Sequence, residues 1–124
     1  SSVNHVIAQR LVRVLCSHCK KPYELTDADI QSLNGMADIG VGETVYKPEG
    51  CAKCFNTGYL GRQAIMEIMV LDDEIKSLIL TTSDANQIKE LALAKGMITL
   101  RRDGMRKVAD GITSIREVLR VTQE

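Results

Sequence analysis

The chain has 124 residues, enough for one modest domain that buries roughly two thirds of the surface exposed when it is unfolded. Sixteen basic side chains balance sixteen acidic ones, so net charge does not draw the chain toward nucleic acid or an anionic membrane. No apolar run approaches the ~18 residues that span a bilayer, and the first residues lack the features of a signal peptide. These observations predict a cytoplasmic protein, a setting in which thiolates bind metal more readily than they form disulfides.

The first predicted element is an amphipathic helix over residues 3–15. Asn4 is a suitable N-cap for it. Apolar side chains recur at intervals of four, as in a helix that buries one face: Val3, Ile7, Leu11 and Leu15. We therefore predict that residues 1–15 form a helix that leads directly into the first cysteines.

All four cysteines occur in two pairs of the same spacing, Cys16-x-x-Cys19 and Cys51-x-x-Cys54. Two residues between cysteines allow the backbone to wrap around one tetrahedral ion, and two such pairs complete a closed site. Because a closed site leaves no position for water or substrate, it indicates a structural metal. The sequence therefore predicts a Zn²⁺ site with Cys16, Cys19, Cys51 and Cys54 as its ligands.

Other interpretations of these cysteines remain open from the sequence. Two disulfides or four unrelated buried thiols are possible, although the flanking lysines and glycines disfavour both. An iron–sulfur site is the main rival metal centre, since soft thiolates in tetrahedral array suit both metals. His18 lies inside the first pair, but four thiolates already close the coordination shell, so we expect its side chain to face solvent.

Between and after the cysteine pairs the sequence predicts a small β module. Thr26 is a suitable N-cap for a short helix, with Leu25 and Ile30 placed as a hydrophobic staple. Residues 44–47 have strand composition, and the turn residues 56–61 precede a second strand over 62–70. A strand, then the turn formed by a cysteine pair, then a further turn and a second strand is the order found in a zinc ribbon. We therefore predict a zinc ribbon over residues 16–70.

The remaining residues, 71–124, predict a C-terminal helical subdomain. We predict four helices, and glycines stop two of them. The predicted caps are Asp72, Ser83 and Ser114, the last within a capping box that ends at Glu117, and the third helix is predicted over about residues 99–110. The predicted fold class is α+β and mainly α: an N-terminal helix, a small Cys₄ zinc-ribbon module and a C-terminal helical bundle.

No catalytic motif is present. The sequence lacks a phosphate-binding loop, a nucleophile elbow and the H-E-x-x-H zinc motif. A basic cluster on the third C-terminal helix has no aromatic residue near it for base stacking, so we interpret it as a solvated face or a rim against another domain: Arg101, Arg102, Arg106 and Lys107. These residues alone predict neither an enzyme nor a nucleic-acid-binding protein.

Several segments in combination resemble the C-terminal part of the ATPases of type II secretion and type IV pilus assembly. Residues 8–20, AQRLVRVLCSHCK, resemble the segment that leads into the tetracysteine motif of these motors. The second half of that motif, GCAKC with TGYLGR, and the tail segments LRRDG and GITSIREVLRVT are similar as well. The retraction motors of the superfamily lack the cysteine insert, so the resemblance is to the extension-type motors.

The resemblance implies a segment of a larger, hexameric P-loop ATPase that binds ATP and Mg²⁺ outside these residues, with residues 1–15 belonging to the ATPase core. The implied partners are the rest of the ATPase, neighbouring subunits and inner-membrane platform proteins, so the membrane is reached only through partners. The implied location is cytoplasmic and peripheral to the bacterial inner membrane. The alternatives are a stand-alone zinc-ribbon adaptor that binds protein or nucleic acid, and an enzyme with an unrecognised site.

Overall fold

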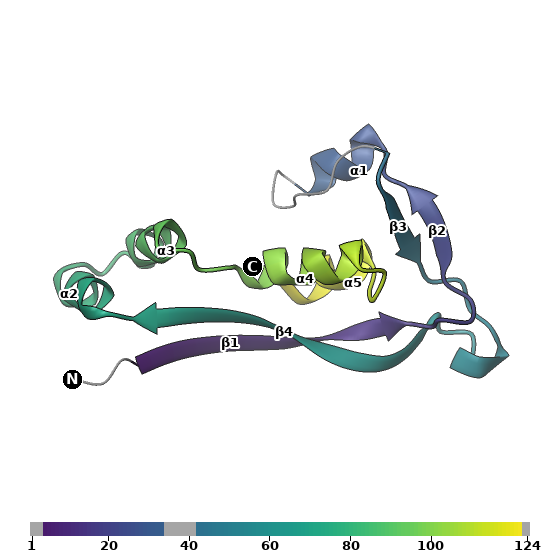
Figure 1. The fold of residues 1–124 in the computed structure, drawn as a ribbon, viewed down its shortest axis with the longest axis horizontal. Helices are drawn as coiled ribbons and strands as arrows, with labels where there is room; N and C mark the ends of the chain where they lie inside the picture. Colours follow the sequence, from purple (N-terminus) through teal and green to yellow (C-terminus); the bar gives the residue numbers. More distant parts are fainter. Residues whose placement is uncertain (1–3, 34–41, 123–124) are drawn as a thin grey trace.

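A computed structural model describes residues 4–33 and 42–122 of the chain. Two long antiparallel strands, β1 (Asn4–Leu15) and β4 (Tyr59–Leu71), form a central ribbon. At one end of this ribbon the chain leaves it to form a second sheet from β2 (Lys21–Glu24) and β3 (Thr44–Lys47), with α1 (Asp27–Ser32) between them. The short 3₁₀ turn η1 (Ala52–Cys54) then leads back into β4 (Figure 1).

The predicted N-terminal helix is wrong, because residues 4–15 are strand β1. An interval of four residues is close to one helical turn, but it is also two full repeats of a strand, so Ile7, Leu11 and Leu15 share one face in either structure. The pairing with β4 decided between them. Each residue from Asn4 to Arg13 has a partner on β4, and only these long-range bonds distinguish the two interpretations.

The central ribbon contains one irregularity, close to the cysteines. Arg13 lies opposite Arg62, whereas Leu15 lies opposite Tyr59, so two residues of β4 face the single residue Val14. Gly61 sits in this bulge with φ of +86°, a conformation that glycine adopts without strain. The predicted strand over residues 62–70 is thus confirmed, and beyond the bulge it continues back to Tyr59.

The C-terminal residues are helical as predicted, in four helices: α2 (Asp73–Thr81), α3 (Ala85–Ala94), α4 (Leu100–Ala109) and α5 (Ile115–Thr122). They pack as two pairs, α2 with α3 and α4 with α5, and not as the single bundle that we predicted. Figure 1 shows α4 and α5 over the middle of the central ribbon and α2 and α3 at the end remote from the second sheet. No described helix is long and apolar enough to cross a membrane.

Local capping chemistry explains where these helices begin. Asp72 accepts a hydrogen bond from the amide of Ile75 at 2.9 Å, as predicted. Thr99, where we predicted the third helix to begin, is its N-cap and accepts a hydrogen bond from the amide of Arg102 at 3.1 Å. Thr26 forms the full capping box of α1. The predicted cap Ser83 is wrong, since its neighbour Asp84 caps α3 instead, and a carboxylate is at least as good an acceptor there.

One hydrophobic core joins the central ribbon, the second sheet and the α4–α5 pair. It consists of Val12, Leu25, Leu33, Val45, Ile65, Met105, Val108 and Val118. α4 approaches α5 closely at Gly104, where an added Cβ would lie 2.7 Å from a methyl group of Val118. The α2–α3 pair contributes no residue to this core; its own buried side chains are Ile75 and Ala92.

Candidate metal centre

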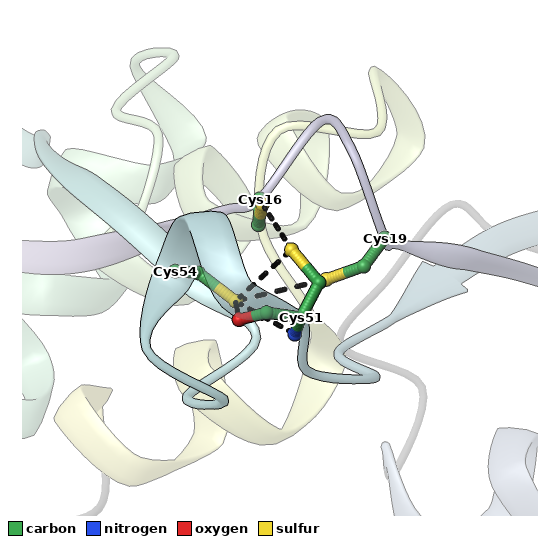
Figure 2. A group of neighbouring side chains, drawn as sticks. All are labelled: Cys16, Cys19, Cys51 and Cys54. Carbon is green, nitrogen blue, oxygen red and sulfur yellow. Dashed lines mark hydrogen bonds between the residues drawn. The ribbon is translucent and has the colours of Figure 1, made fainter.

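The four cysteines converge where the central ribbon meets the second sheet. Cys16 directly follows β1, and Cys19 closes the tight turn that leads to β2. Cys51 and Cys54 lie at the start and the end of η1. Figure 2 shows the four side chains directed toward one another, and their Sγ atoms all lie within 4.8 Å of one another. We call these four sulfur atoms the cysteine centre.

The spacing within the cysteine centre matches a single tetrahedral ion. The sulfur–sulfur distances are 3.8 Å for Cys16–Cys51, 3.8 Å for Cys19–Cys54 and 3.7 Å for Cys51–Cys54. A tetrahedron with the ~2.3 Å zinc–sulfur bond has an edge of about 3.8 Å, whereas a disulfide needs about 2.05 Å. All four cysteines are free of disulfides. The donor set and its geometry therefore fit one structural metal ion.

Backbone amides surround the sulfur atoms and favour their charged form. Gly50 donates to Cys19 Sγ at 3.3 Å, and Gly58 donates to Cys54 Sγ at 3.2 Å. Both glycines adopt positive φ angles, +115° and +82°, and a Cβ on Gly58 would overlap Pro48. The two glycines are therefore needed for the close approach of the backbone to the sulfurs.

The thiols of the cysteine centre differ in acidity when no metal is bound. Burial raises the pKa of the Cys54 thiol, but the amides of Cys51 and Gly58 outweigh this and lower it to about 6. Burial raises the pKa of Cys19 to about 11, against the opposing effect of the Gly50 amide. Because a metal ligand must be a thiolate, binding an ion here displaces the proton of Cys19.

The two histidines lie outside the cysteine centre. His18 is exposed in the first cysteine turn. Among the described residues, the group that could hold a metal ion consists of the four cysteines and does not include His18. His5 is exposed on β1. The side chain of His18 thus faces solvent, as predicted from the sequence.

Sequence reasoning missed a buried carboxylate next to this site. Glu117 is 1% exposed; it accepts hydrogen bonds from Arg13 at 2.8, 3.0 and 3.1 Å and from Arg120 at 2.7 and 2.9 Å. Burial opposes its charge, but the guanidinium groups of Arg120 and Arg13 outweigh burial and lower its pKa to about 2. The sequence predicts Glu117 only as part of a capping box. Arg120 is a local partner, three positions along α5, but Arg13 lies 104 positions away, so the sequence carries no signal for that half of the network.

Part of the predicted basic cluster is used inside the fold. The Arg101 side chain donates to the hydroxyl and to the carbonyl of Thr122, at 2.9 and 3.0 Å. These bonds join the start of α4 to the end of α5. This guanidinium therefore has a structural role that the sequence did not reveal.

Comparison with known proteins agrees with the predicted resemblance. The family model described as "Type II/IV secretion system protein" matches residues 1–120. Similar curated proteins include "Type IV pilus assembly ATPase PilB" of Thermus thermophilus, 45% identical over 96% of this chain and 13% of that protein. "Type II secretion system protein E" of Pseudomonas aeruginosa is 43% identical over 100% of this chain and 24% of that protein.

A third relative, "Type IV pilus assembly ATPase TfpB" of Acinetobacter baylyi, is 44% identical over 94% of this chain and 20% of its own length. The chain thus spans between about an eighth and a quarter of these relatives. Relatives with secretion names and relatives with pilus names match at nearly equal identity. The chain belongs to the type II/IV secretion system protein family.

Proposed function

We propose that this chain is the C-terminal region of an ATPase of type II secretion or type IV pilus assembly, and that its cysteine centre holds one structural Zn²⁺. The observation that supports the metal most directly is the set of sulfur–sulfur distances, 3.7 to 3.8 Å. A bound ion would cross-link two loops that bury few apolar side chains. Its binding free energy would be on the order of 10 kcal/mol, similar to the stability of a whole domain.

Zinc is favoured over iron–sulfur clusters by the compactness of the cysteine centre. A cluster places several iron atoms between its cysteine ligands and therefore needs a wider opening between the sulfurs. The test is elemental analysis of protein purified without added metal. We expect one zinc per chain, and we expect the variants Cys16→Ser and Cys51→Ser to lose it. Iron in place of zinc, or a full disulfide content with no metal, would refute the assignment.

In the proposed parent protein, hexamer formation, ATP and Mg²⁺ binding and hydrolysis depend on residues outside this chain. Within it, we assign residues 16–70 to the metal module, residues 71–124 to a helical subdomain and residues 1–15, which include strand β1, to the ATPase core. The rigid metal module would present a surface to platform proteins of the inner membrane. This places the protein in the cytoplasm, peripheral to that membrane through its partners.

The open edge of the central ribbon supports the proposed attachment to an ATPase core. The amide of Arg13 donates to Glu117 and that of Leu15 to Ile112, so both point away from β4. Along an antiparallel strand, the backbone N–H and C=O groups of successive residues point alternately toward and away from the partner strand. Those of Ile7 and Leu11 therefore point away from β4, as those of Arg13 do. Among the residues that the structure describes, none bonds to these two. An unpaired edge of this kind accepts a further strand.

One face of the central ribbon is also apolar and largely exposed, although α2 and α3 border it at one end. Ile7 and Ile68 lie directly opposite each other and are 59% and 43% exposed. The face continues through Leu11, Met66 and Val70, which are 46%, 40% and 46% exposed. Contiguous apolar surface of this kind on a folded protein marks an interface. We propose that the remainder of the longer ATPase covers this face and pairs with the adjacent edge.

This attachment is tested in the full-length protein with Ile68→Lys and the matched variant Gln63→Lys. Gln63 is exposed on the same strand but on the opposite face of the central ribbon. Burying a lysine in the interface should lower the midpoint of thermal unfolding and the ATPase rate in the first variant only. Equal behaviour of the two variants would show that the apolar face is not covered by the ATPase core.

A further inference from the structure

We propose that the cysteine centre also fixes the position of α5, through the turn of residues 111–114 that joins α4 to α5. In this arrangement the metal centre, the turn and α5 open as one cooperative unit, whereas the α2–α3 pair behaves independently. The proposal rests on the metal site proposed above. It concerns residues 111–122, none of which is a metal ligand. It therefore assigns to the metal a structural effect well beyond the loops that carry the cysteines.

The first half of the turn is bonded to residues that flank the first cysteine pair. Lys20, next to Cys19, donates from Nζ to the carbonyl of Gly111 at 2.9 Å. The same ammonium lies 4.6 Å from the centre of the Tyr46 ring, which packs against Gly111. The amide of Leu15, next to Cys16, donates to the carbonyl of Ile112 at 2.7 Å. Two successive residues of the turn are thereby bonded to the chain on either side of the first pair.

The second half of the turn is bonded to both strands of the central ribbon. The hydroxyl of Thr113 donates to the carbonyl of Arg13 at 2.7 Å. The hydroxyls of Tyr59 and Ser114 are hydrogen-bonded at 2.7 Å. Thr113 and Ser114 are 0% and 3% exposed, so water cannot replace these partners. All four residues of the turn therefore depend on groups within a few positions of a cysteine.

The turn in turn sets the first residues of α5. Ser114 Oγ accepts from the amide of Glu117 at 3.1 Å and so caps the helix. The carboxylate of Glu117 is held by Arg13, three residues before Cys16. Val118 is completely buried in the core. A displacement of the strand ends next to the cysteine centre would therefore leave α5 without its cap and without its buried ion pair.

The α2–α3 pair is held by a different kind of link, away from the cysteine centre. Its polar link joins the start of α2 to the end of α3, through Lys95 with Asp72 at 3.1 Å and with Glu74 at 2.7 Å. Outside the core, α2 packs against β4, and α3 lines a pocket together with Val6 and Ala8 of β1. Figure 1 places this pair at the end of the ribbon remote from η1. Metal removal should therefore affect the two helix pairs differently.

The first experiment measures amide hydrogen exchange of the full-length protein with Zn²⁺ bound and after removal of Zn²⁺ by a chelator. We expect exchange of residues 111–122 to accelerate at least about tenfold, with residues 73–94 changing less than about twofold. Unchanged exchange at 111–122, or equal acceleration in both helix pairs, would overturn the proposal. A protein that contains no zinc would instead refute the metal assignment on which the proposal rests.

A pair of matched double variants separates this connection from the metal itself. Tyr59→Phe with Lys20→Met removes two bonds to the turn. Tyr23→Phe with Lys47→Met removes a similar cation–ring pair, 5.9 Å apart, on the second sheet. Both variants should keep one zinc per chain. Loss of two hydrogen bonds should speed exchange at residues 111–118 by about tenfold or more in the first variant only. The same exchange rate in both variants would contradict the proposal.

Discussion

The two ends of the central ribbon are stabilised in different ways. At the end near the cysteine centre, buried polar groups such as Glu117 and Ser114 connect segments that lie far apart in the sequence. At the opposite end, the α2–α3 pair relies on helix caps and on the exposed link from Lys95 to Asp72. The first arrangement loses several bonds together when one part moves. The second is assembled from local interactions, each of which can open without the others.

This comparison is informative because the end near the cysteine centre has fewer apolar side chains to bury than the end with the α2–α3 pair. The loops around Cys16–Cys19 and Cys51–Cys54 carry few buried side chains other than cysteines. A small segment with little apolar surface to bury needs a cross-link or a bound metal for stability. The cysteine centre and the network around Glu117 provide such support. The α2–α3 pair has regular helices and needs no such support.

The largest expected effect is that of Cys54→Ser. Cys54 is 1% exposed, and its sulfur accepts from the amides of Cys51 and Gly58. A serine oxygen is a poor zinc ligand, so the variant should lose the metal and most of the binding energy, on the order of 10 kcal/mol. Zinc content and thermal unfolding measure the loss. Ser17→Ala, in an exposed position of the first pair, serves as the control and should keep both.

The next effect tests the buried ion pair by Glu117→Gln. The change leaves two guanidinium groups next to an uncharged amide, and breaking a buried pair of this kind costs about 3 kcal/mol. Urea unfolding measures it, with the exposed Glu24→Gln as the control. Destabilisation of the control by an equal amount would show that the network contributes nothing specific.

The same carboxylate predicts a pH dependence. Its pKa in the folded protein, about 2, lies below the ordinary value of 4.5, so the folded state favours the charged form. The stabilisation is therefore complete above pH 4.5 and is lost progressively as the pH falls through about 2. Unfolding free energy measured across this range should fall more steeply in the wild type than in Glu117→Gln. Parallel curves would contradict the assignment.

A smaller effect is expected from Gly104→Ala, which tests the packing of α4 against α5. The added Cβ would lie 2.7 Å from a methyl of Val118, so the helices must separate. Overpacking should cost about 1–3 kcal/mol, more than the gain in helix propensity from alanine. Thermal unfolding measures it. The exposed position Arg106 on the same helix provides the control, since Arg106→Ala should be nearly neutral.

The smallest effect is expected from Lys95→Met at the other end of the central ribbon. Its ion pairs with Asp72 and Glu74 are exposed to solvent and screened by salt. We expect faster amide exchange in the first turn of α2 and no change in α5 or in the midpoint of unfolding. A large fall in global stability would show that the two ends of the ribbon are not independent.

The features that could be predicted from the sequence depend on neighbouring residues. The caps Thr26 and Asp72 were confirmed because a capping side chain bonds an amide two or three residues away. The convergence of the two cysteine pairs was predicted because each pair forms a turn of its own. The strand over residues 62–70 was predicted from the turn residues that precede it.

Apart from the cap of α3, which is Asp84 and not Ser83, the errors and omissions concern long-range contacts. The period-four pattern of residues 3–15 suits helix and strand equally, and only pairing with β4 makes it a strand. The helices predicted as one bundle form two pairs, because the core takes in α4 and α5 and leaves α2 and α3 outside. Glu117 was missed because Arg13 approaches it only once β1 and α5 are in contact.

The sequence by itself therefore determined the four cysteines, their pairing into two turns, the starts of most helices and the family to which the chain belongs. These follow from residue types at short spacings, where local backbone geometry controls which groups meet. Only the tertiary structure decided that residues 4–15 are a strand, that Glu117 is a buried anion and that the turn of residues 111–114 is bonded beside the cysteine centre. Those outcomes depend on contacts between distant segments, which no local pattern specifies.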